Sequence, residues 1–139
     1  MRLFVDSSVL IYGLELRDSN SARILDLIHL EKLQGVVNDK VIQEVREYFR
    51  RRRGRQYAFL IEAIIRENYE IVPPDKIKPF VDRLRGGVKE KDLEHYATVK
   101  AEQLSDLVAY DRDFLKLAEY STPRGFLKKI GMECQDTEY

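Results

Sequence analysis

Cysteine and histidine are scarce in this sequence, and glycine-rich loops are missing. A single cysteine, Cys134, cannot form an internal disulfide framework, so we expect a reducing compartment. Only two histidines are present, and no cysteine and histidine cluster of the kind that holds zinc occurs. Gly86 and Gly87 precede VKEKD as a turn and do not form a phosphate-cradling loop. Disulfide scaffolds, zinc proteins and glycine-loop nucleotide binders are therefore excluded.

Long apolar runs and an excess of one charge are also missing. No apolar stretch approaches the length of a membrane span, and Asp6 lies where the apolar centre of a signal peptide would be. We therefore expect a cytoplasmic protein with no membrane partner. The 24 basic and 24 acidic residues cancel, so a nucleic-acid partner would have to be held by a local patch.

Short apolar strands alternate with helix-sized segments along the chain. Strands are expected at 2–5, 35–38, 69–72 and 106–110, and helices at 22–34, 39–53, 55–68, 76–84, 90–104, 114–120 and 123–130. Pro79 is expected to limit the start of its helix. This order predicts an α/β fold of three layers, with helices on both sides of a central parallel sheet of four to five strands. No linker divides the chain, so residues 1–139 are expected to form one domain.

Acidic residues follow the first and the fourth expected strand. Parallel sheets place ligands beyond the carboxyl ends of their strands, so these acids are candidate site residues. Asp6 stands in an otherwise apolar run, where a buried carboxylate needs a partner, a proton or a metal, although it also fits a helix N-cap. Ser7 and Ser8 suit either a cap or a phosphate contact. Asp111 is the better ligand at its strand end, and Asp113 the better cap for the helix that follows.

Two further acids come from expected helices. Glu44 lies just outside the apolar stripe of its helix, and helical periodicity favours a solvated flank for it. Asp92 suits the dipole at the start of its helix, and periodicity does not choose between Asp92 and Glu94 as the acid nearer the core. His95 is expected at the surface or in support of the site. Acids that meet at one sheet edge need a cation, and an oxygen-only site suits Mg²⁺ or Mn²⁺.

Four stretches of the sequence together resemble the PIN domain, and more narrowly the VapC-like toxins and their archaeal relatives. They are FVDSSVLIY, VIQEV, KDLEHYATVKAEQLSDLVAYDRDF and TPRGFLKKIG, and they run nearly end to end in the family's order. The resemblance implies a Mg²⁺- or Mn²⁺-dependent ribonuclease. The catalytic acids and metal ligands that it implies are Asp6, Glu44, Asp92 and Asp111, with Ser7, Ser8 and Asp113 beside them.

The resemblance also implies partners, and the sequence departs from the family pattern at two positions. Ala109 stands where the family commonly has threonine, and Ser8 where asparagine is common. RNA is the implied substrate, an antitoxin protein a further partner, and a homodimer the implied assembly. A housekeeping RNA-processing nuclease fits the same residues as well as a toxin does. A catalytically weak RNA- or protein-binding module of PIN ancestry is the non-enzymatic alternative.

One dense basic run lies at the end of the helix expected at 39–53. Its members are Arg50, Arg51, Arg52, Arg53 and Arg55. Three interpretations stay open: a path for the RNA backbone with Tyr48 and Tyr57 stacking nearby, a contact with an antitoxin, or a solvated helix end favoured by the dipole.

Other enzyme classes fit less well. A phosphatase of the haloacid-dehalogenase type needs a second aspartate where Ser8 stands, and a phosphoacceptor domain needs an acid pair after the first strand. Serine-triad chemistry would need His29 or His95 beside a nucleophile.

Overall fold

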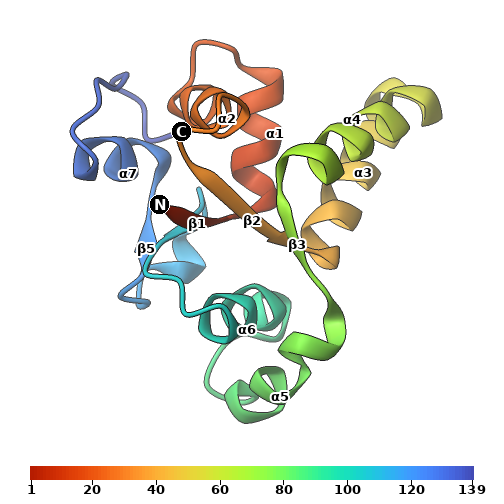
Figure 1. Cartoon of the computed structure of the whole chain (residues 1–139), viewed down its shortest axis with the longest axis vertical. Helices are drawn as coiled ribbons and strands as arrows, with labels where there is room; N and C mark the ends of the chain where they lie inside the picture. The colour runs from red at the N-terminus through yellow and green to blue at the C-terminus, as the bar shows by residue number, and fades with distance from the viewer.

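The computed structural model describes all 139 residues and contains one sheet of five parallel strands (Figure 1). The strand order is β3-β2-β1-β4-β5. The strands are β1 (Arg2–Val5), β2 (Gln34–Asn38), β3 (Glu70–Val72), β4 (Leu107–Val108) and β5 (Tyr120–Ser121). The predicted α/β class and central parallel sheet are confirmed.

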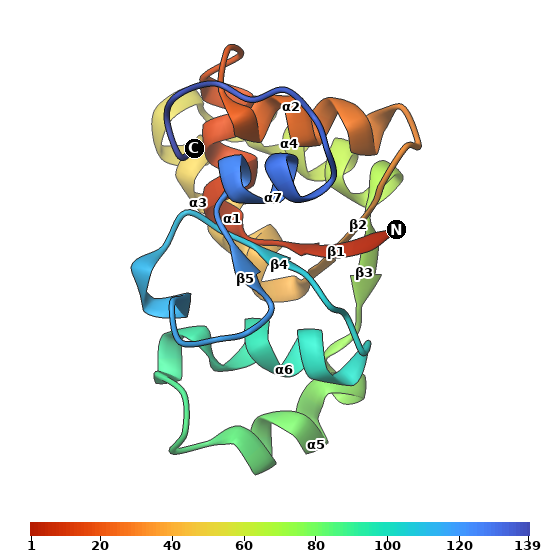
Figure 2. The same cartoon turned by 90° about the vertical axis from the view of Figure 1, so that its left-hand side faces the viewer.

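Helices cover both faces of this sheet. They are α1 (Ser7–Glu15), α2 (Asn20–His29), α3 (Asp39–Arg53), α4 (Arg55–Asn68), α5 (Pro74–Leu84), α6 (Leu93–Ala101) and α7 (Pro123–Lys129), with 3₁₀ turns at Glu90–Asp92 and Arg112–Phe114. Figure 2 shows α1, α2 and α7 on one side of the sheet and α5 and α6 on the other, as a three-layer fold requires. None of the helices has the length and hydropathy needed to cross a membrane.

The direction of winding reverses between β1 and β4. The chain runs outward from β1 through β2 to β3, then crosses to the other side of β1 for β4 and β5. β1 and β4 pair directly, and the Asp6 amide donates a hydrogen bond to the Val108 carbonyl at 3.0 Å. In open parallel sheets, such a switch point opens a crevice at the carboxyl ends of the strands. Asp6 and Asp111 follow these two strands.

Large apolar side chains from the sheet and from the helices fill the core. Phe4 of β1, Phe49 of α3 and Phe126 of α7 have no exposed surface. Each such side chain stabilises the fold by about 1.5–3 kcal/mol relative to an exposed one. The core therefore holds the sheet and its helices as one body.

Gly54 separates two helices that pack along each other. Its φ of 87° lies in the left-handed region that favours glycine, so α3 ends there and α4 begins at the next residue. The predicted helices 39–53 and 55–68 are both confirmed, and they form a hairpin that packs against α1 (Figure 1).

Two predicted helices are shorter in the structure. α2 ends at His29 and not at Gln34, because Gln34 enters β2, where it pairs with Arg2. α6 covers only Leu93–Ala101 of the predicted 90–104, with a 3₁₀ turn before it and Gln103 at a positive φ of 53° after it.

Two further predictions were wrong. Residues 114–120 are not a helix, because the Leu107 amide bonds the Glu119 carbonyl and Tyr120 pairs with Leu107 as the fifth strand. Pro79 does not limit the start of α5, which begins at Pro74 and contains Pro79 in its interior. Pro74 is favourable at the first helical position, and Pro79 removes only one backbone hydrogen bond farther along.

Candidate functional site

Asp6 lies at the carboxyl end of β1 and is almost fully buried. Its Oδ2 accepts hydrogen bonds from the Ser8 amide at 3.2 Å and the Ser8 hydroxyl at 2.6 Å. Asp6 is thus the N-cap of α1 and a buried carboxylate at once. Burial raises the pKa of Asp6, and the hydrogen bonds from Ser8 and the nearby His95 oppose that rise only in part. The carboxylate is held in an environment that disfavours its charge.

His95 lies between two of the predicted acids. Its Nε2 is 3.4 Å from Asp6 Oδ1 and 3.1 Å from Glu44 Oε1. Asn38 directs its amide Nδ2 at His95 Nδ1 at 3.2 Å, which makes Nδ1 the acceptor and leaves the ring proton on Nε2. Only 2% of His95 is exposed, so of the two predicted positions the structure excludes the surface and agrees with support of the site. His95 joins α6 to the ends of β1 and α3.

Glu44 lies on an exposed flank of α3, as helical periodicity predicts, but it also contacts the site. Its side chain is 42% exposed, but its carboxylate accepts a hydrogen bond from His95. Partial burial opposes ionisation, yet the bond from His95 and a weaker contribution from Ser7 lower the pKa of Glu44. Glu44 therefore carries its negative charge over the crevice at the end of β1.

Asp92 lies immediately before α6 and has one oxygen without a partner. It is 5% exposed, it makes no capping hydrogen bond, and its buried Oδ2 accepts none. Burial raises the pKa of Asp92, and the charges of Asp111 and Asp113 raise it further. An orphaned buried carboxylate oxygen is rare in native structures and calls for an explanation such as an ion.

The capping role predicted for Asp113 belongs to Asp111 instead. Asp111 is the N-cap of the 3₁₀ turn, since its Oδ1 accepts a hydrogen bond from the Asp113 amide at 2.9 Å. Asp113 instead forms ion pairs with Lys89 at 2.7 Å and with Lys91. These hydrogen bonds lower the pKa of Asp113 to about 2. Asp111 Oδ2 is 4.0 Å from Lys91 Nζ and keeps its second oxygen at the end of β4.

The predicted acids form two groups at the same edge of the sheet. Asp6 and Glu44 share His95, whereas Asp92 and Asp111 are electrostatic neighbours. No three His, Cys, Asp or Glu side chains stand as a complete metal-binding cluster. The donors are all oxygens, and the Asp92 oxygen is unpartnered, so the residues fit a hard divalent cation such as Mg²⁺ or Mn²⁺.

The sequence did not single out Tyr120 of β5. Burial raises its pKa, a hydrogen bond with the Asp111 backbone opposes the rise, and the charges of Asp111, Glu138 and Asp6 add to it. No sequence pattern marks this residue, because its strand was not predicted. For His95 a signal existed, since it lies one helical turn after Asp92.

The arginine run is largely engaged by acids of the same molecule. Arg50 and Arg51 pair with Glu47 at 2.8 and 2.9 Å, and Arg53 pairs with Glu15 at 3.1 Å. The guanidinium groups of Arg52 and Arg53 lie over the rings of Tyr48 and Tyr57. These contacts place the run, with Arg55 after it, on the α3–α4 hairpin and not among the four acids.

The sequence matches the PIN domain family over residues 3–120, and the chain therefore belongs to that family. A comparison with curated proteins finds none that matches.

Solved structures of toxin–antitoxin proteins have the same fold. A structure of VapBC2 from Rickettsia felis bound to a DNA fragment of its promoter has a TM-score of 0.66 at 15% identity, covering 84% of this chain and 92% of that one. A toxin–antitoxin complex from Klebsiella pneumoniae has a TM-score of 0.67 at 19% identity, with 87% and 97% covered. VapC20 of Mycobacterium tuberculosis, a toxin that cleaves the sarcin–ricin loop, has a TM-score of 0.61 at 19% identity, with 81% and 92% covered.

Proposed function

We propose that this PIN domain protein is an endoribonuclease that hydrolyses RNA phosphodiester bonds with Mg²⁺ or Mn²⁺. The observation that carries the proposal is the buried, unpartnered Oδ2 of Asp92, at the same sheet edge as Asp6 and Asp111. Membership of the PIN family and the similarity to a toxin described as cleaving the sarcin–ricin loop support RNA as the substrate.

The proposed ligands are Asp6, Asp92, Asp111 and Glu44. A bound divalent ion supplies positive charge at the scissile phosphate and lowers the pKa of a water molecule. Ser8 fixes the orientation of the Asp6 carboxylate through its hydroxyl and its amide. The Nε2 proton of His95 holds Glu44 in place over the crevice. In-line attack on phosphorus would leave a 3′-hydroxyl and a 5′-phosphate without a covalent enzyme intermediate.

The test is cleavage of single-stranded RNA during a titration with Mg²⁺ or Mn²⁺. Asp6→Asn keeps the shape of the side chain and removes its charge, so we expect the rate to fall by a factor on the order of 100 or more. Asp18→Asn is the matched control, because Asp18 is exposed and forms no ion pair. Unchanged cleavage by Asp6→Asn would overturn the assignment of the site.

We also propose that the protein is the toxin of a VapBC-type pair. The toxin–antitoxin complexes among the similar structures support this role and an antitoxin partner. Expression of the chain alone should arrest growth, and expression of Asp6→Asn should not. Cleavage of RNA in vitro without arrest would favour a housekeeping nuclease, and RNA binding without cleavage would favour a binding module. The proposed homodimer is tested by the mass of the purified protein in sedimentation.

A further inference from the structure

Three tyrosine side chains gather at the end of β4. The ring centroids of Tyr12 and Tyr139 are 4.7 Å apart and nearly parallel, and Tyr110 lies 5.4 Å from each of them. These separations are those of interacting aromatic rings. Tyr110 is 40% exposed although it belongs to this cluster. The three rings, here called the tyrosine cluster, therefore present aromatic surface to solvent.

The tyrosine cluster is tied to the candidate site through Ser8. The Tyr110 amide donates a hydrogen bond to the Ser8 hydroxyl at 3.0 Å, and that hydroxyl donates to Asp6 at 2.6 Å. Tyr110 also directly precedes Asp111 in the chain. The position of the exposed ring is thus fixed relative to two of the proposed metal ligands.

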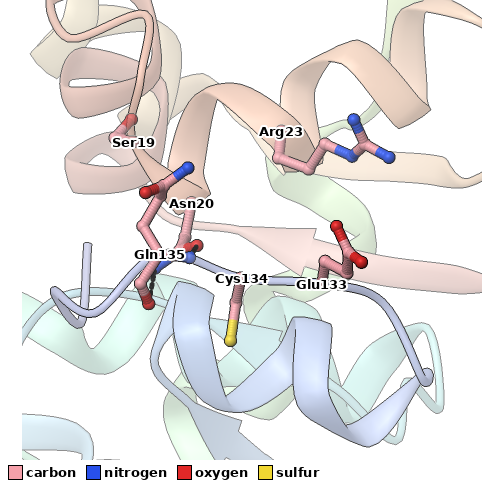
Figure 3. Close-up of a pocket in the computed structure, with 6 residues that line it drawn as sticks. All are labelled: Ser19, Asn20, Arg23, Glu133, Cys134 and Gln135. Atoms are coloured by element: carbon pink, nitrogen blue, oxygen red, sulfur yellow. Dashed lines mark hydrogen bonds between the residues drawn. The ribbon is translucent and has the colours of Figure 1, made fainter.

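Hydrogen bonds between the start of α2 and the C-terminal residues 135–139 hold Tyr139 in the tyrosine cluster. The Ser21 amide donates to the Tyr139 carbonyl at 2.8 Å. The buried Asn20 accepts from the Gln135 amide and donates to the Thr137 carbonyl, both at 2.6 Å. Figure 3 shows Asn20, at the start of α2, beside Gln135 in the lining of a small pocket. Tyr139 is therefore ordered against Tyr12 before any ligand arrives.

We propose that the tyrosine cluster is a stacking platform for one base of single-stranded RNA, next to the phosphate that is cleaved. This inference rests on the proposed ribonuclease function. Aromatic rings stack on any base, whereas the surrounding carboxylates repel phosphate unless a cation is bound. The chain has no net charge to attract RNA, so affinity has to come from local contacts of this kind. A preordered ring loses little conformational entropy on binding.

The experiment measures binding of a fluorescent single-stranded RNA to the full chain in the presence of a chelator. Stacking contributes about 1–3 kcal/mol per base, so Tyr110→Ala should weaken binding roughly 5- to 150-fold. Tyr110→Phe keeps the ring and should bind within about twofold of wild type, because stacking does not need the hydroxyl. Phe59→Ala on α4 removes another aromatic side chain that is 71% exposed, and it should leave binding unchanged.

Tyr110→Leu separates stacking from structural support. Leucine preserves apolar packing against the neighbouring rings, so its unfolding temperature should match that of wild type while RNA binding falls as in Tyr110→Ala. In cleavage assays with Mn²⁺, KM should rise for both variants and kcat should change little. Equal binding by wild type, Tyr110→Leu and Tyr110→Ala would overturn the platform.

The two proposals fail in distinguishable ways. Wild-type protein that binds RNA through Tyr110 but never cleaves it would contradict the nuclease and leave the platform standing. Metal-dependent cleavage with an unchanged KM in Tyr110→Ala would contradict the platform alone. A greater loss of binding in Phe59→Ala than in Tyr110→Ala would place the RNA on the α3–α4 hairpin and overturn the inference.

Discussion

At the scale of single residues, Asp6 and Asp92 are ionisable groups held where their charge is unfavourable. Burial raises the pKa of both carboxyl groups above the value near 4 that they have in an unfolded chain. The folded protein then binds protons more tightly than the unfolded one. Such groups stabilise the fold when protonated, and this stabilisation is lost as the pH rises through the raised pKa. A cation that binds the carboxylates removes the penalty.

We expect Asp92→Asn to stabilise the metal-free protein at neutral pH. A buried polar group without a partner costs about 1–3 kcal/mol, and the neutral amide avoids the larger penalty of an ionised oxygen. The free energy of unfolding in urea should therefore rise by roughly 1 kcal/mol at pH 7. The difference between variant and wild type should shrink as the pH falls toward 4, because Asp92 takes up a proton more readily in the folded state than in the unfolded one. A less stable variant at pH 7 would contradict this account.

Addition of Mn²⁺ provides the complementary measurement on the same variant. A ligand that binds only the folded state stabilises it by about 2.7 kcal/mol at one hundred times its dissociation constant. The unfolding temperature of the wild type should rise with Mn²⁺, and that of Asp92→Asn should rise much less. Asp18→Asn should respond as the wild type does.

The sequence predicted the four acids that we propose as ligands, but not the contacts that connect them. Asp6 and Asp111 were predictable, because each follows an apolar strand whose end a parallel sheet brings to one edge. For Glu44, helical periodicity predicted the exposed flank but not the hydrogen bond from His95, because periodicity describes one helix at a time. The sequence left open whether His95 lies at the surface or supports the site, since its burial depends on Phe4 and Asn38 from the sheet.

At the scale of secondary-structure elements, Asn38 joins β2, α3 and α6. Its Oδ1 caps α3 by accepting from the Val41 amide at 2.9 Å. Its Nδ2 donates to Thr98 Oγ1 at 2.9 Å and lies 3.2 Å from His95 Nδ1. One buried side chain therefore satisfies the start of a helix and orients the histidine of the site.

Two substitutions of Asn38 should separate these roles. Asn38→Asp keeps the capping oxygen and removes the donor, and Asn38→Ala removes both. A lost cap costs about 1 kcal/mol, and a buried hydrogen-bonding group left alone about 1–3 kcal/mol. Urea unfolding should place Asn38→Ala roughly 2–4 kcal/mol below the wild type. We expect Asn38→Asp to cleave RNA more slowly than the wild type. Equal rates would show that cleavage does not require the hydrogen bond by which Asn38 orients His95.

Helices and strands were predictable where the local sequence determines the structure, and not where pairing with a distant strand determines it. The helix 39–53 has an N-cap, an amphipathic pattern and Gly54 at its end, and its bounds were predicted correctly. Residues 114–120 also have helical spacing, but their last residue completes a parallel ladder with Leu107. Hydrogen bonds to a distant strand outweigh local preference there, and one sequence does not reveal them.

At the scale of the whole molecule, the balance of charge hides an uneven distribution. The arginine run lies on the α3–α4 hairpin, yet Glu47 neutralises Arg50 and Arg51. These two arginines lower the pKa of Glu47 to about 2, so the pairs persist across the physiological range. The field that the run projects toward RNA is accordingly reduced.

Glu47→Gln should release both arginines and strengthen non-specific binding of single-stranded RNA. Each phosphate contact on a single strand contributes about −0.7 to the slope of log K against log salt. The slope should therefore steepen by roughly 0.7–1.4, measured by fluorescence anisotropy between about 50 and 200 mM salt. Glu133→Gln makes the same change in net charge at an exposed acid without an ion pair, and an equal effect there would assign the gain to net charge alone.

The candidate site is divided between the two helical layers. Asp6 caps a helix on one face of the sheet, and Asp92 precedes a helix on the other, while β4, which pairs with β1, has only two residues. A small displacement of one layer against the other would separate the carboxylates while the core stayed closed. Inactivation by mild heat should thus precede melting and reverse on cooling.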